Sequence, residues 1–194
     1  MAADKICFVT TGATAPFIAL IEAVLKPDFL DAIREAGYTR LLVQHGTAKQ
    51  TFDTGASIAS IHLDHNPGGG RLVINGFDFS DNGLVDQFKL VQKAKGLVIS
   101  HAGSGTILAV LRYGLPLIVV PNTQLLDNHQ DELATAMEKS NYLLKGDVNN
   151  LAKMIPLAEG FRIAQASFPP ITSGKHRETK TFAAIMDESL GFME

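Results

Sequence analysis

Short apolar runs rich in β-branched residues alternate with stretches of helical periodicity along almost the whole chain. The runs predicted to be strands span residues 6–10, 40–44, 71–75, 97–100 and 116–120, with a shorter one near 142–144. Helices are predicted at 16–24, 27–36, 84–93, 104–113, 128–140, 148–158 and 176–190. This alternation is typical of a parallel sheet wrapped by helices. We therefore expect an α/β fold, a Rossmann-like doubly wound parallel sheet that binds its ligand at the carboxyl ends of the strands.

Glycine and proline mark several of the boundaries. Pro16 and Pro27 suit the first position of a helix, and Gly37 and Gly114 are expected to end helices. The segment 45–70 has the weakest pattern, with polar turns, a short predicted helix near 55–61 and a predicted loop at its Pro-Gly-Gly-Gly end.

The composition supports one core and narrows the class of protein. The chain has 194 residues, 46% of them hydrophobic, which is enough to bury a single complete core. Its formal net charge of −3 and lack of a long basic run argue against a nucleic-acid partner. The single cysteine, Cys7, lies in a predicted strand and is expected to be a core residue in a reducing compartment. The apolar runs fall far short of the roughly 20 residues that span a bilayer, and the start is not a secretory signal, so we expect a soluble, cytoplasmic protein.

The segment 97–106 carries the strongest chemical signal. A predicted buried strand leads into a glycine-rich turn, and the turn opens a helix at Ser104. Gly103 and Gly105 lack a Cβ, so a ligand can approach their backbone, and the first N–H groups of the helix are free to bind an anion. His101 and Thr106 add side-chain donors, as does the Ser104 hydroxyl. The expected ligand is a phosphate or a diphosphate.

Other glycine-rich motifs do not fit this turn. The lysine of a Walker motif is absent, G-x-G-x-x-G fails at Leu108, and the nucleophile elbow G-x-S-x-G fails at Ala102 and Thr106. Ser104 is therefore expected to be a helix cap or a phosphate ligand rather than a nucleophile. An ordinary glycine-rich turn with a capped helix remains an alternative.

A second polar cluster follows the predicted strand 116–120. Asp127 is a good residue for a helix N-cap, and Gln130 would then be a solvated residue of the first turn. Alternatively, these carboxylate and amide groups lie at the same sheet edge as the phosphate turn and hold sugar hydroxyls.

Together these segments resemble nucleotide-sugar glycosyltransferases of the two-domain GT-B type, specifically their donor-binding C-terminal half. The elements that match are SHAGSGT (100–106), GLPLIVVP (114–121) and DNHQ (127–130). The chain is further similar to the soluble donor-binding subunits of the eukaryotic UDP-N-acetylglucosamine (UDP-GlcNAc) transferase of dolichol-linked oligosaccharide synthesis. That likeness rests on VTTGATAPF (9–17), GFDFS (76–80), LVISHAGSGTIL (97–108) and LLDNHQ (125–130), and it covers nearly the whole chain.

The resemblance assigns roles to particular residues. Gly12 and Thr14 would help to close over the donor diphosphate. The phosphate turn would consist of His101, Gly103, Ser104, Gly105 and Thr106, and the GlcNAc hydroxyls would be read by Asp127, Asn128 and Gln130. Phe77 would flank the uracil. One departure is Ala109, which stands where the superfamily often has an acidic residue for the ribose hydroxyls.

The implied reaction is transfer of GlcNAc from UDP-GlcNAc to GlcNAc-diphosphodolichol, forming a β-1,4 linkage with inversion. The resemblance implies no cofactor and no metal, and His62 and His65 show no evident ligand set with the distant Cys7. The general base is not identifiable and is expected to come from a membrane-anchored partner that binds the acceptor. That partner would recruit the chain to the cytosolic face of the endoplasmic reticulum.

Two domain segments are expected, a UDP-sugar-binding domain at 1–175 and a C-terminal helix at 176–194. An apolar stripe in the second segment suits either docking on the partner or packing on the chain's own sheet; its members are Phe182, Ile185, Met186, Leu190 and Met193.

Two other classes of function use the same turn. One is a stand-alone nucleotide-sugar epimerase or hydrolase, which would need an acid and base pair within the chain. The other is a non-catalytic module that only binds a nucleotide sugar. Turnover by the purified chain alone would favour the first, and a complex that binds donor without transferring it would favour the second.

Overall fold

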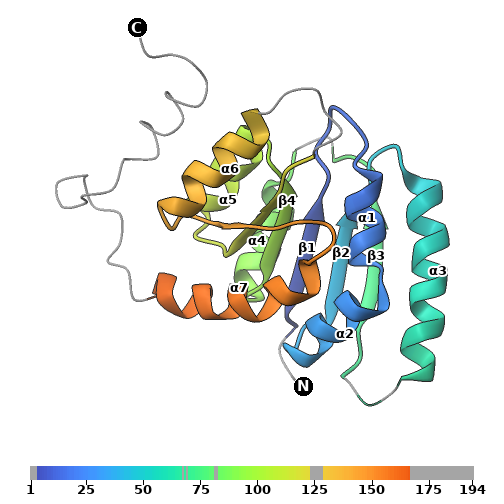
Figure 1. Ribbon diagram of the computed structural model, residues 1–194. Helices are drawn as coiled ribbons and strands as arrows, with labels where there is room; N and C mark the ends of the chain where they lie inside the picture. Colours follow the sequence, from blue (N-terminus) through green and yellow to red (C-terminus); the bar gives the residue numbers. More distant parts are fainter. Residues whose placement is uncertain (1–3, 67, 69, 81–82, 123–128, 167–194) are drawn as a thin grey trace, which may run out of the picture.

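The computed structural model describes residues 4–66, 68, 70–80, 83–122 and 129–166, which form a sheet with helices on both faces (Figure 1). The six strands are β1 (Ile6–Thr10), β2 (Arg40–Gln44), β3 (Val73–Phe77), β4 (Leu97–His101), β5 (Leu117–Val120) and β6 (Leu144–Lys145). All neighbouring strands pair in parallel, in the order β3-β2-β1-β4-β5-β6. This is the order of a doubly wound sheet, which confirms the predicted fold and places its topological switch between β1 and β4.

The helices divide between the two faces of the sheet (Figure 1). One face carries α1 (Ile18–Val24), α2 (Pro27–Glu35), α3 (Lys49–His65) and α7 (Leu151–Ala166). The other carries α4 (Val85–Lys93), α5 (Ser104–Arg112) and α6 (His129–Lys139). Strand β1 feeds both cores, because Cys7 and Val9 point to the first face while Ile6 and Phe8 point to the second. Burial raises the pKa of the Cys7 thiol, as expected of an unreactive core residue.

The boundaries predicted from strong local signals are confirmed. Strand β2 has both predicted ends, and α2 begins at Pro27 and is followed by Gly37 at φ +81°. Helix α5 begins at Ser104 as predicted and ends one residue early, before Gly114 at φ +61°.

Three predicted element boundaries, those of α1, α3 and β3, are wrong. Helix α1 begins at Ile18 rather than Pro16, because the buried Phe17 takes the N-cap position in a non-helical conformation. The segment predicted as a short helix forms the 17-residue α3, whose helical pattern is weak because only Phe52 and Ala59 are buried. Strand β3 lies two residues later than predicted, since its pairing with β2 brings Gly76 into the sheet against the Phe52 ring.

Helix α7 also extends well beyond the predicted end at 158. Its second half is fixed by Glu159, whose carboxylate accepts hydrogen bonds from Tyr38 at 2.5 Å, Lys5 at 2.8 Å and Arg162 at 3.2 Å. Arg162 also donates to the carbonyl of Gly96 at 2.9 Å. Because these partners lie far apart in the sequence, the local sequence pattern does not predict that α7 continues past residue 158. The predicted domain boundary at 175 and the predicted final helix lie outside the described residues.

Replacing Glu159 with glutamine is expected to destabilise the fold by about 1–3 kcal/mol, since charge-assisted hydrogen bonds of a partly buried group are lost. Burial alone would raise the pKa of Glu159, but hydrogen bonds from Arg162, Lys5 and Tyr38 outweigh it and lower that pKa below its ordinary 4.5. The free energy of unfolding of the wild type should therefore fall as the pH drops from 4.5 through the lowered pKa, and that of Glu159→Gln should fall less.

Urea denaturation at several pH values measures both effects. The matched control is Asp53→Asn, which breaks the exposed Lys49–Asp53 pair and should cost at most a few tenths of a kcal/mol. Equal losses in the two variants would contradict the anchoring role of Glu159.

Within the described residues, no helix combines the length and the apolar character that crossing a membrane requires.

Candidate donor-binding site

Buried polar residues gather at the carboxyl edge of the sheet. Of the seven buried polar or charged residues in the described part of the chain, six lie at or just past the ends of β1, β2, β4 and β5: Thr10, Thr11, Gln44, His45, Ser100 and Asn122. Burying polar groups is costly unless they are hydrogen-bonded or serve a ligand. This edge includes the β1–β4 switch, where doubly wound sheets bind their ligands.

The ring of His101 lies at that switch, between two glycines. His101 ends β4, and Gly12 follows β1 at φ +81°. A Cβ on Gly12 would lie 2.5 Å from Cε1 of the ring, and one on Gly103 would lie 2.3 Å from Nε2. Both distances are far below van der Waals contact, so the ring is accommodated because neither position has a side chain. From the sequence, glycine at position 103 was expected because it lets a ligand approach the backbone. The structure shows a second reason, which is that a side chain there would clash with the His101 ring.

The surroundings of His101 favour the neutral form of its imidazole. Burial lowers the pKa of its imidazole below the ordinary 6.5, and the backbone of Thr10 offsets only part of that effect. Its Nδ1 is buried and makes no hydrogen bond with any residue that the structure describes. A neutral ring has one N–H donor and one acceptor nitrogen, and so can offer a hydrogen bond to an anion without carrying charge.

The amino end of α5 follows His101 directly and is open to an anion. Its N-cap is Gly103, in an extended conformation, and no side chain of the described residues caps it. The predicted alternative of a capping Ser104 is therefore wrong, because Ser104 is the first helical residue. No acidic residue lies in the first turn, and a Cβ on Gly105 would meet no atom within 4 Å. The free N–H groups at Ser104, Gly105 and Thr106 favour a negatively charged ligand.

A small open pocket lies at the same edge of the sheet, along the loop after β1. Its wall is the loop from Thr11 to Pro16, with His45, Gly46, Thr47 and Phe79 opposite, and its volume is about 50 Å³. Gly12 and Thr14 both line it, so the structure brings these two predicted residues to the same edge as His101. The volume is much smaller than the roughly 300 Å³ or more that encloses a typical ligand. The described residues therefore form one open wall rather than an enclosed cavity.

Phe77, predicted to flank a base, and Phe79, for which no role was predicted, lie in different surroundings. Phe77, expected to flank a base, packs in the core with its ring stacked on Phe8 at a centroid distance of 6.1 Å. Phe79 is the aromatic at the pocket, 45% exposed and close to Gly46. Strand β3 runs two residues further than predicted, and that shift places Phe77 within the sheet and Phe79 beyond it.

The second polar cluster is described in part. The backbone N–H of Asn122, just after β5, donates to Oε1 of Gln130 in the first turn of α6 at 3.2 Å. Gln130 is thus half-buried and bonded to the sheet edge rather than simply solvated. Asp127 and Asn128 lie outside the described residues. Ala109 lies in α5, partly buried against the core.

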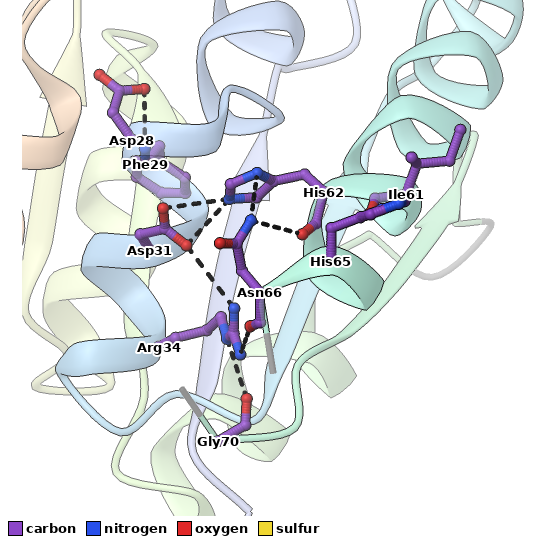
Figure 2. Close-up of polar contacts among 9 residues, drawn as sticks. All are labelled: Asp28, Phe29, Asp31, Arg34, Ile61, His62, His65, Asn66 and Gly70. Atoms are coloured by element: carbon purple, nitrogen blue, oxygen red, sulfur yellow. Dashed lines mark hydrogen bonds and ion pairs between the residues drawn. The ribbon is translucent and has the colours of Figure 1, made fainter. Parts of the chain in front are cut away.

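The two histidines weighed as metal ligands belong to a different part of the fold. Figure 2 shows His62 on α3 facing Asp31 on α2, with Nε2 3.1 Å from both carboxylate oxygens. Arg34 completes this contact by donating to the carbonyls of Asn66 at 2.7 Å and Gly70 at 3.1 Å (Figure 2). His65 lies 2.7 Å from the carbonyl of Ile61 through Nδ1. Among the residues described, no three His, Cys, Asp or Glu side chains come together as a metal site.

Thr10, Thr11 and Gln44 are the site residues that sequence reasoning missed. Thr10 is the last residue of β1, Thr11 follows it directly, and Gln44 is the last residue of β2 after a run of three apolar residues. That position is a usable signal, because a polar residue at the carboxyl end of a buried strand lies where ligands bind.

Comparison with known proteins adds an independent line of evidence. Residues 6–157 match the glycosyltransferase family 28 C-terminal domain. The chain is 34% identical to the UDP-N-acetylglucosamine transferase subunit ALG13 of Cryptococcus neoformans, over 95% of this chain and 96% of that protein. It is 33% identical to the Saccharomyces cerevisiae subunit of the same name, over 72% of this chain and 76% of that one.

Solved structures show the same fold. An NMR solution structure of ALG13 matches with a TM-score of 0.58 and 30% identity, covering 89% of this chain and 92% of that one. The crystal structure of Acinetobacter baumannii MurG matches with a TM-score of 0.54 at 15% identity. The match covers 86% of this chain and 43% of MurG, so this chain corresponds in fold to less than half of that protein.

Proposed function

This chain belongs to the glycosyltransferase family 28 C-terminal domain family and, within it, to the ALG13 UDP-N-acetylglucosamine transferase subunits, and from that membership we propose that it binds UDP-GlcNAc for transfer to GlcNAc-diphosphodolichol. The transfer would be the second step of dolichol-linked oligosaccharide synthesis for N-glycosylation. The observation that carries the proposal is the pairing of a neutral His101 with an uncapped α5 at the β1–β4 switch.

The proposed reaction is a displacement at C1 of the donor sugar. The 4-hydroxyl oxygen of the acceptor GlcNAc forms a bond to C1 while the bond from C1 to the β-phosphate oxygen breaks, and the configuration inverts. The electron pair of the broken bond leaves with UDP, and the hydroxyl proton passes to a base on the partner.

The contribution of this chain is to stabilise the leaving group. Negative charge grows on the diphosphate as the C1–O bond breaks. In this proposal the diphosphate lies against the N–H groups at the start of α5 and the His101 ring, which would stabilise the charge without reorganising. The proposal invokes no metal, and it rests on hydrogen bonds from these donors to stabilise the growing charge.

The open wall at the carboxyl edge supports a requirement for a second subunit. The pocket is too small to enclose a UDP-sugar, and a displacement needs an acceptor on the opposite side of C1. We propose a membrane-anchored partner that supplies the acceptor site and brings this chain to the cytosolic face of the endoplasmic reticulum.

Reconstitution tests the proposal. Transfer of radiolabelled GlcNAc from UDP-GlcNAc to a lipid-linked acceptor should occur with the partner present and not with either protein alone. Turnover of UDP-GlcNAc by the purified chain alone would instead indicate an epimerase or hydrolase. A complex that binds donor without transferring it would leave binding as the function.

The variant Gly105→Ala distinguishes an effect on donor binding from an effect on the stability of the fold. Its Cβ meets no atom of the described residues within 4 Å and the position is helical, so stability should be unchanged or rise by about 0.5–1 kcal/mol. If a diphosphate lies against this turn, the added methyl group should raise the KM for UDP-GlcNAc roughly tenfold, equivalent to about 1.4 kcal/mol. A KM equal to that of the wild type would place the donor elsewhere.

A further inference from the structure

The contacts at the end of β1 point to a positioning role for Thr10 and Gln44. Resting on the proposed function, we propose that these residues hold the loop after β1 so that Gly12 keeps its place against the His101 ring and the loop stays formed for the donor. Neither residue is expected to touch the donor.

The contacts form a short chain from one strand end to the other. The Thr10 hydroxyl donates to Oε1 of Gln44 at 2.5 Å, and the backbone N–H of Gly12 donates to Oγ1 of Thr10 at 3.3 Å. The hydroxyl of Thr11 donates to the backbone carbonyl of Gln44 at 3.1 Å. All three side chains are buried, with exposed fractions of 4% or less. We call this group, Thr10, Thr11 and Gln44, the strand-end latch.

The direction of these hydrogen bonds lets the Thr10 hydroxyl contact Gln44 and Gly12 at the same time. A threonine hydroxyl has one proton, and here Oε1 of Gln44 accepts it. The lone pairs of Oγ1 are then available to the Gly12 N–H. Thr10 and Gln44 are also directly paired across β1 and β2, as the last pair before both strands end. The latch therefore acts where the chain leaves the sheet.

The loop held by the latch forms the wall of the donor site. Residues Thr11 to Pro16 line the pocket, and Gly12 lies against His101 with φ +81°, a conformation that glycine adopts freely and that residues with a side chain rarely adopt. Without the latch, the loop would have to be ordered when the donor binds, and that ordering costs binding free energy. The latch should therefore lower the KM for UDP-GlcNAc more than it raises kcat.

The test compares two substitutions at one buried position, in the complex with the membrane partner. Thr10→Val keeps the shape of the side chain and removes its hydroxyl. It should raise the KM for UDP-GlcNAc roughly tenfold and leave kcat within about twofold of the wild type. A tenfold rise corresponds to about 1.4 kcal/mol, the size of one lost hydrogen bond. Thr10→Ser keeps the hydroxyl and should restore a KM within about twofold of the wild type. A general loss of folded protein would lower the apparent kcat and leave the KM unchanged.

Gln44→Met provides the second arm, because it removes the acceptor at similar volume. If both residues act through one bond, the double variant Thr10→Val/Gln44→Met should show the KM of either single variant rather than the product of the two effects. NMR gives a readout independent of activity: the Gly12 amide and the His101 ring resonances should shift in Thr10→Val and keep their wild-type positions in Thr10→Ser.

The outcomes separate the two proposals. A wild-type complex without transfer would refute the proposed function, while the NMR comparison would still report on the latch. If the wild-type complex transfers GlcNAc, two results would overturn the latch alone. One is an unchanged KM in Thr10→Val, and the other is an equal rise in KM in Thr10→Val and Thr10→Ser.

Discussion

Replacing Gly103 with alanine is expected to lower GlcNAc transfer by the reconstituted complex about 100-fold, because a misplacement of about 1 Å in a site has effects of that size. The new Cβ would lie 2.3 Å from Nε2 of His101 and 2.9 Å from Cε1. Gly12 packs against the same ring, with no room for a side chain there either. Either the ring or the amino end of α5 must move, and both are proposed to face the diphosphate.

The same substitution should also destabilise the fold. Overpacking a close contact costs about 1–3 kcal/mol, which urea denaturation resolves. Because the clash is with one side chain, truncating that side chain should relieve it. The double variant His101→Ala/Gly103→Ala should therefore be more stable than the sum of the single effects predicts.

A matched glycine provides the control. Gly160 lies in α7 with no atom within 4 Å of an added Cβ, and its position is exposed. Gly160→Ala should leave transfer unchanged and raise helix stability by about 0.5–1 kcal/mol. Wild-type transfer and stability in Gly103→Ala would contradict the assignment of this glycine to the His101 ring.

The second large effect is expected from His101→Ala, which should reduce GlcNAc transfer by about 100- to 1000-fold. Losing one preorganised hydrogen-bond donor to the charge that develops in the transition state usually has an effect of this size. The backbone of β4 remains paired on both sides through Ser100, so the sheet should persist. The measurement is kcat/KM with radiolabelled donor, alongside NMR titration with UDP-GlcNAc.

The pH dependence distinguishes a neutral ring from a charged one. Because the pKa of His101 is lowered in the folded state, transfer should not fall as the pH decreases through 6.5, and should fall only when the lower pKa is reached. The unfolded chain binds the proton near 6.5 while the folded chain resists it. The free energy of unfolding should therefore decrease below pH 6.5 in the wild type, and His101→Ala should lack this decrease. Loss of transfer centred at or above pH 6.5 would indicate that the ring acts as a cation.

Much of this fold was predictable because its signals are local. Strand β2 and helix α2 have their predicted starts, since the apolar run of β2 is continuous and Pro27 and Gly37 bound the helix. The glycine-rich turn after β4 was predictable for the same reason, because the strand, the glycines and the helix start lie within ten residues, 97–106. Family membership followed from these motifs and was confirmed by the comparisons.

Other features depended on residues that meet only in the folded chain. Helix α3 has few buried positions and hence little periodicity, and α7 owes its length to contacts of Glu159 with Lys5 and Tyr38. The role of Phe77 was misjudged because the register of an edge strand is set by its neighbour β2.

The amino-acid sequence alone determined the order of strands and helices, the doubly wound class and the glycine-rich turn before α5, because each rests on neighbours along the chain. The tertiary structure decided which groups meet at the β1–β4 switch. It placed Gly12 against His101, set Thr10 opposite Gln44, and left α5 uncapped. The physical reason is that parallel pairing brings the carboxyl ends of distant strands together, and packing at that edge then dictates where a side chain cannot be present.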